Sequence, residues 1–210
     1  MNVSTFKHIL IAATAISLAV TGCRNPSADD APIPAAATVT EQALAALPVR
    51  DEDTGAHYNR DDWGDWTSPG RTCSTRVVIL QQQGRDVSLG KGCRVRSGTW
   101  TSPYDGLVLT DPNQVQIDHR VPVKEAVRSG ARDWTPEQRH RFYNDPNNLI
   151  AVSAKSNTSK GDRDPGRWTP RKRDAWCDYA TAYITTKTTY RLSIDTRERD
   201  GLATMLATCH

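Results

Sequence analysis

The residues of this sequence best suited to chemistry begin with an adjacent aspartate and histidine, Asp118 and His119. A histidine ring has a pKa near neutrality, so it can take a proton from an attacking water. Asp118 and Asn157 offer the oxygen ligands that a hard divalent cation such as Mg²⁺ prefers. These types suit phosphodiester hydrolysis, although Asp-His pairs occur by chance and asparagines are common in turns.

A hairpin is expected to carry the Asp-His pair. Apolar runs at 107–110 and 115–121 flank the turn sequence 111–114, a pattern typical of two strands joined by a turn. Asp118 and His119 would then lie on the second strand of this hairpin.

A strand and a short helix are expected to carry the remaining candidates. Residues 149–152 have the composition of a short buried strand, which Ser153 follows as a helix cap. Gly161 ends this helix in the favoured manner. Asn157 and Lys160 are three residues apart and therefore share one helix face.

The other expected elements are also helices and short strands. Thr135, Pro136 and Gln138 have the spacing of a capping box with proline in the first turn, so a helix starts there. The run 77–80 fits a helix or a strand. Further helices are expected over 40–47 (capped by Thr40), 74–83, 171–188 and 194–208, and strands over 92–95 and 99–101.

The order Asp-His, Asn148 and Asn157 resembles that of the HNH (His-Me finger, ββα-metal) nucleases. Further motifs are similar to those of the secreted bacterial HNH endonucleases, and the resemblance covers nearly everything after residue 44. Asn157 stands where the family name has its final histidine, a variation common in this group. The further motifs include Tyr58-x-Arg60, Trp63-Gly64, Pro103-Tyr104-x-Gly106, Asn144-Asp145-Pro146, Lys160-Gly161-Asp162 and Cys177-x-Tyr179.

The chemistry of phosphodiester cleavage gives each candidate an expected role. His119 would be the general base, and Asp118 and Asn157 would bind a divalent metal, expected to be Mg²⁺, that acts as a Lewis acid. The resemblance implies that Asn148 holds His119 in orientation. Lys160, on the same helix as Asn157, is our candidate for a phosphate contact as a point charge. The resemblance also implies 5′-phosphate ends after cleavage.

The cysteines favour an oxidising compartment. If Cys23 carries lipid, an even number remains, which fits disulfides outside the cytoplasm. No C-x-x-C pair occurs, so a four-cysteine zinc site is not expected. Four cysteines can form two disulfides in three ways. We favour the connectivity with the two local bridges, Cys73–Cys93 and Cys177–Cys209.

The N-terminus has the features of an export signal. A basic start, a short apolar run and small residues describe a signal peptide over 1–22, and the run is short for a membrane span. Val-Thr-Gly-Cys resembles a bacterial lipobox ending at Cys23, and residues 23–39 would form a flexible tether. The expected location is the cell envelope, at the outer membrane or periplasmic face; a plain signal peptide and a secreted protein are the alternative.

The charge permits nucleic acid as a partner without requiring it. The net charge is +3, and a basic run is usually only a solvated surface. One such run is expected to contact the phosphate backbone of DNA: Arg163, Arg167, Arg171, Lys172 and Arg173.

The sequence therefore predicts an α+β fold, with a ββα-metal (HNH) finger embedded in a mostly helical, disulfide-stapled single domain over 40–210. The expected function is metal-dependent endonucleolytic cleavage of DNA with little sequence specificity, by a monomer. RNA as a substrate is left open. The alternative is a non-catalytic, DNA-binding envelope lipoprotein.

Overall fold

The computed structural model describes Met1 and residues 38–67 and 72–209. The expected signal peptide, Cys23 and most of the tether lie outside the described residues. The helices are α1 Val39–Ala46, α2 Thr75–Gln83, α3 Val123–Ala126, α4 Pro136–Tyr143, α5 Ala154–Lys160, α6 Trp176–Thr189 and α7 Thr196–Leu206. The strands are β1 Arg85–Leu89, β2 Val95–Thr101, β3 Val108–Leu109, β4 Val115–His119 and β5 Leu149–Ser153. Short 3₁₀ or π turns lie at Arg60–Trp63, Lys91–Cys93, Val127–Ala131 and Arg173–Ala175.

Several local predictions are confirmed, because side-chain caps define the helix ends. Thr135 and Gln138 form the expected capping box at α4. Ser153 caps α5, which Gly161 ends. The start of α1 differs from expectation: Thr38, not Thr40, is the cap, because Thr38 has an extended backbone and completes a capping box with Glu41.

The strands form two separate sheets, which corrects the expected hairpin. β3 pairs with β2 in the three-stranded sheet β1-β2-β3, whereas β4 pairs antiparallel with β5. The turn itself is present, because Asp111 accepts a hydrogen bond from the backbone of Asn113 and Arg76 donates to the carbonyl oxygens of Pro112 and Val115. The two runs part after this turn because β4 and β5 bury each other's apolar residues.

The short strand expected over 92–95 is also different. Residues Lys91–Cys93 form a 3₁₀ turn, in which Gly92 has a positive φ of 69°, a conformation that glycine adopts readily. This turn joins β1 to β2. β1 has no counterpart in the sequence-based expectation, and β2 includes the expected strand at 99–101.

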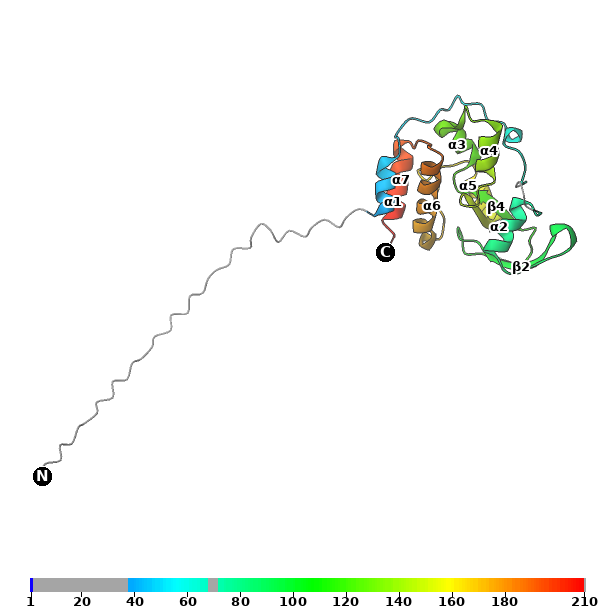
Figure 1. Ribbon diagram of the computed structural model, residues 1–210, viewed down its shortest axis with the longest axis horizontal. Coiled ribbons are helices and arrows are strands. Elements are labelled where there is room, and N and C mark those ends of the chain that lie inside the picture. Colours follow the sequence, from blue (N-terminus) through cyan, green and yellow to red (C-terminus); the bar gives the residue numbers. More distant parts are fainter. Residues whose placement is uncertain (2–37, 68–71, 210) are drawn as a thin grey trace. The chain divides into compact units, whose positions relative to one another are not determined.

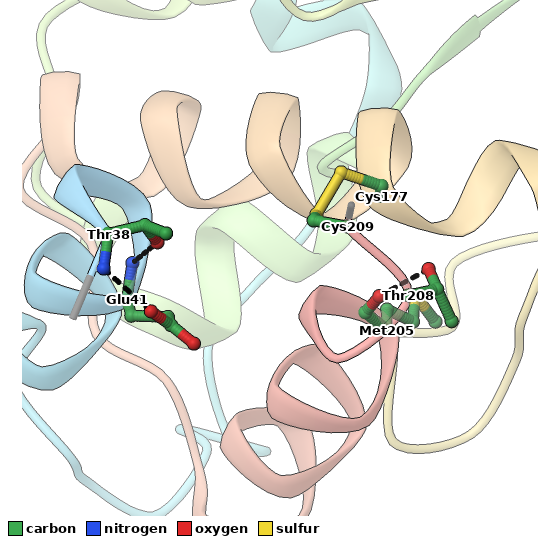
Figure 2. The surroundings of a disulfide bond; sticks show 6 residues. All are labelled: Thr38, Glu41, Cys177, Met205, Thr208 and Cys209. Atoms are coloured by element: carbon green, nitrogen blue, oxygen red, sulfur yellow. Dashed lines mark hydrogen bonds between the residues drawn. A yellow bond between two sulfur atoms is a disulfide. The ribbon is translucent and has the colours of Figure 1, made fainter. Parts of the chain in front are cut away.

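Helices α1, α6 and α7 lie side by side, as the blue, brown and red helices of Figure 1 show. The Cys177–Cys209 disulfide joins the start of α6 to the end of the segment after α7 (Figure 2). Cys73–Cys93 is the second bridge, and it ties the residue before the cap of α2 to the β1–β2 connection. Both expected pairings are therefore confirmed, as is an α+β fold with two disulfides. Within the described residues, no helix is long and apolar enough to span a bilayer.

A buried cluster of charges links three helices. The Lys187 ammonium on α6 lies 2.8 Å from Glu125 Oε1 on α3 and 3.0 Å from Glu198 Oε1 on α7. It also donates to the Ser193 carbonyl oxygen at 2.8 Å. Burial and the nearby Glu125 raise the pKa of Glu198 to about 7, against the opposing effect of Lys187. These ion pairs tie α3 to α6 and α7.

Candidate active site

Strands β4 and β5 pair antiparallel and helix α5 packs on them, although α3, the π turn and α4 lie between the two strands in the sequence. In the β4–β5 pair, Asp118 lies opposite Ile150 and His119 opposite Leu149. Because Ser153 both ends β5 and caps α5, the helix follows the strand without a loop and packs on both strands. This connection brings the predicted residues of α5 to the end of β4.

The Asp118 carboxylate is buried, and both of its oxygens accept hydrogen bonds. The Tyr104 hydroxyl donates to Oδ2 at 2.7 Å, and the Lys160 ammonium donates to Oδ1 at 3.0 Å. Burial and the charge of Asp118 raise the pKa of Tyr104 well above its usual value, which keeps its hydroxyl protonated. The carboxylate is thus held from two sides.

Lys160 has no exposed surface, which argues against the phosphate contact expected for it. Besides Asp118, it donates to the His119 carbonyl oxygen at 2.8 Å. Burial lowers the pKa of Lys160, and the neighbouring Asp118 opposes this effect. An enclosed ammonium with these partners positions Asp118 and the β4 backbone instead of reaching a substrate.

His119 lies in an aromatic environment that holds its ring. Nε2 lies 2.8 Å from the Tyr143 carbonyl oxygen, and the ring stacks on Trp66 with centroids 5.5 Å apart. A carbonyl oxygen can only accept, so this contact assigns the proton to Nε2 and leaves the lone pair on Nδ1. Burial lowers the pKa of His119 to about 3; the Tyr143 carbonyl opposes this, and the nearby Arg60 and Lys160 charges add to it. The imidazole is therefore neutral at physiological pH.

Asn148 acts on the backbone and not on the His119 ring. Its Oδ1 accepts from the Val121 backbone N–H at 2.8 Å, and its Nδ2 donates to the Val121 carbonyl oxygen at 3.1 Å. The Arg120 N–H donates to the Asn148 carbonyl oxygen at 2.8 Å. Asn148 thus clamps the chain just after His119, while Tyr143 makes the direct ring contact that was expected of Asn148.

Asp118, His119 and Asn157 line one open cavity of about 300 Å³. The Asn157 Nδ2 donates to Gln116 Oε1 at 2.7 Å, which leaves the amide Oδ1 available as an oxygen ligand. Lys160 is absent from the lining, in agreement with its burial. The other lining residues are Tyr58, Arg60, Ile117, Pro122, Val123, Lys124, Thr158, Gly161 and Asp162.

These donors fit a hard divalent cation. Each Asp118 oxygen keeps a lone pair beyond the hydrogen bond that it accepts, and Asn157 contributes a neutral oxygen to the same cavity. A second group of acidic residues, Glu52, Asp164 and Asp195, lies outside this cavity. Arg167 bonds Glu52 and Asp164 and lies 3.8 Å from Asp195, and Arg128 lies 3.4 Å from Glu52, so these carboxylates already have arginine partners.

The five basic residues expected to contact nucleic acid differ in their exposure and in their partners. Arg167 is committed to its carboxylate partners, and Arg163 donates to the carbonyl oxygens of Ser159 and Lys160. The three basic residues at 171–173 are exposed. Lys172 lies at a different cavity, beside Tyr104, and this cavity shares no lining residue with that of His119.

Sequence reasoning assigned no role to three residues that contact the candidate site or each other. Tyr104, Tyr143 and Arg60 contact Asp118, His119 or each other. Tyr104 and Arg60 belong to the motifs Pro103-Tyr104 and Tyr58-x-Arg60. These motifs carry the family resemblance, but the sequence assigned them no function. Tyr143 had no usable signal, because it contacts His119 through a backbone carbonyl that any residue possesses.

The fold and site define an α+β, disulfide-bonded domain built around a buried aspartate–histidine pair. A family model described as "GmrSD restriction endonucleases, C-terminal domain" matches residues 79–205, more than half of the sequence, and the chain belongs to this nuclease family. An "Uncharacterized secreted protein" from Arthroderma benhamiae is 39% identical over 199 residues, which covers 93% of this chain and 97% of that protein. No solved structure matches the chain.

Proposed function

We propose that this protein is a metal-dependent endonuclease that hydrolyses DNA phosphodiester bonds with little sequence specificity. The observation that carries the proposal is the cavity that Asp118, His119 and Asn157 line together. Membership of a restriction-endonuclease family supports a nuclease. We further propose that β4, β5 and α5 form a ββα-metal finger of the HNH type.

In this proposal His119 is the general base. Its Nδ1 takes a proton from the water that attacks phosphorus, while the Tyr143 carbonyl holds the protonated Nε2. Asn148 keeps the chain after His119 in register, and Lys160 and Tyr104 hold the Asp118 carboxylate. These four residues are positioning residues.

Asp118 and Asn157 are proposed to hold a divalent cation, which we expect to be Mg²⁺. When bound, the cation supplies Lewis acidity to the phosphate and its leaving oxygen. Lys160 sets the carboxylate in place, and Gln116 sets the amide, so both ligands are oriented before a cation arrives.

The enzyme is proposed to act outside the cytoplasm. The relative's name, the two disulfides and the apolar N-terminal run support export. We also propose that Cys23 carries lipid and that residues 23–39 tether the domain, for which the lipobox-like sequence is the support.

Nicking of supercoiled plasmid tests the proposed activity. Wild-type protein should nick DNA with Mg²⁺ and lose this activity in EDTA. His119→Ala should lower the rate by about 10²–10⁴-fold, because general-base catalysis contributes on this scale. His57→Ala is the matched control, since His57 is exposed and lies outside the cavity.

Two further variants separate metal binding from proton transfer. Asp118→Ala and Asn157→Ala should raise the Mg²⁺ concentration that gives half-maximal nicking, whereas His119→Ala should leave it nearly unchanged. Full activity in EDTA, or wild-type nicking by His119→Ala, contradicts the mechanism. A protein that binds DNA but never nicks it would be the non-catalytic alternative.

A further inference from the structure

The charged groups that line the His119 cavity are compensated with one exception. Asp118 pairs with Lys160, and Asp162 accepts a hydrogen bond from Arg128 at 2.8 Å and lies 3.1 Å from Lys124. Among the described residues, Arg60 forms no ion pair. A cation that lines a cavity without a carboxylate partner can bind an anion.

Arg60 is nevertheless held in a defined position. It opens the 3₁₀ turn Arg60–Trp63, which the buried Trp63 side chain anchors in the core. Its guanidinium donates to the Tyr143 hydroxyl at 2.6 Å and lies 4.9 Å from the centre of the Tyr143 ring. The side chain itself is exposed, so a ligand can reach it.

Tyr143 connects Arg60 to the general base. Its carbonyl oxygen accepts from His119 Nε2 at 2.8 Å, and its hydroxyl accepts from Arg60 at 2.6 Å. One residue therefore contacts both the proposed general base and the Arg60 guanidinium. The His119 ring also lies 4.8 Å from the Tyr143 ring, so the three side chains form a continuous group.

We propose that Arg60 binds a non-bridging oxygen of the phosphodiester that is cut, on the side of the cavity where Tyr143 holds it. The inference rests on the proposed function, since it names the group that receives the substrate phosphate. A guanidinium has several N–H donors in one plane, so it can keep its bond to Tyr143 and donate to a phosphate oxygen as well. As water attacks phosphorus, this contact would stabilise charge on the phosphate oxygens.

The test measures how strongly the protein distinguishes a charged phosphate from a neutral one. The probes are a thymidine dinucleotide with a natural phosphodiester and the same dinucleotide with a neutral methylphosphonate. Binding is followed by NMR titration with Mg²⁺, in a His119→Ala background that prevents turnover. The ratio of the two Kd values is compared with and without Arg60→Gln. Arg199→Gln is the matched control, because Arg199 is an exposed arginine on α7 outside the cavity.

We expect the parent to prefer the charged dinucleotide by about tenfold or more, the scale of one charge-assisted hydrogen bond. Arg60→Gln should reduce this preference towards one, and Arg199→Gln should preserve it. Tyr143→Phe, which retains the backbone carbonyl, should reduce it partly, because Arg60 loses its positioning partner. If Arg60→Gln does not fold, Arg60→Lys takes its place and should also weaken the preference, since the planar fork is lost.

An unchanged preference in the folded Arg60 variant overturns the proposal, and so does a parent that binds both dinucleotides equally. Both outcomes are distinguishable from failure of the proposed function, because the ratio of the two Kd values is measured without turnover. Absence of nicking by the wild type, with an Arg60-dependent preference intact, would refute the nuclease and leave the phosphate site.

Discussion

Replacing Lys160 with methionine decides between a positioning role and a phosphate contact for this residue. The ammonium has no exposed surface and lies 3.0 Å from Asp118 Oδ1. Methionine has an unbranched, flexible side chain that fills irregular space in a core without a charge. The variant therefore leaves the Asp118 carboxylate buried, with the Tyr104 hydroxyl as its remaining side-chain donor.

The expected loss of stability follows from this geometry. Removing one partner of a buried ion pair costs about 3–5 kcal/mol, because the other charge stays desolvated without compensation. For a domain of this size, 1 kcal/mol changes the melting temperature by roughly 2–4 °C, so Tm should fall by about 6–20 °C. A lysine that only contacts phosphate would have no such effect in the absence of DNA.

Thermal unfolding followed by circular dichroism, without DNA or metal, measures this effect. Lys155→Met is the control, since Lys155 is exposed on the same helix and should change Tm little. Adding Asp118→Asn to Lys160→Met should restore much of the loss, because no buried carboxylate is then left unpaired. A Tm of Lys160→Met within about 2 °C of the wild type would refute the assigned pairing.

Three further predictions concern stability and location. The double variant Cys177→Ser/Cys209→Ser removes a bridge across a separation of 32 residues. It should lose about 4 kcal/mol and melt roughly 10 °C lower; an unchanged Tm would contradict this. The raised pKa of Glu198 means that the folded state holds this proton more tightly than the unfolded chain does. Its stabilising contribution is therefore present below about pH 4.5 and is lost as pH rises towards 7, so urea unfolding of Glu198→Gln should lack this decrease. If the free energies of unfolding of variant and wild type change with pH in parallel, Glu198 makes no such contribution. Finally, Cys23→Ser should move the protein out of the membrane fraction, and wild type that is already free of membranes would argue against the lipid anchor.

The local elements of the fold could be predicted from sequence because their causes are local. A cap or capping box acts over three or four residues, so Thr135 with Gln138 and Ser153 with Gly161 are sufficient to place α4 and α5. The disulfide pairing was predictable for a related reason, since close cysteines on neighbouring elements pair readily. At the start of α1 the choice between Thr38 and Thr40 needed the backbone conformation, which the sequence does not contain.

The partners of each strand were decided by the tertiary structure. The turn at residues 111–114 was correctly expected, yet β3 joins β2 and β4 joins β5. An apolar run specifies that a strand is buried, but many partners satisfy this requirement. In the observed pairing of β4 with β5, both strands are covered by other parts of the chain, such as α2 and α5. Which strands pair therefore depends on segments that are distant in the sequence.

The site shows the same division. Residue types, their order and the family resemblance together indicated that Asp118, His119 and Asn157 could perform hydrolysis, and the structure places all three in one cavity. The role of Lys160 could not be predicted, because helical spacing gives its direction but not its burial. That burial is set by strand β4, which supplies both of its acceptors. Tyr143 likewise acts through a backbone carbonyl, which sequence cannot distinguish and only folding brings to His119.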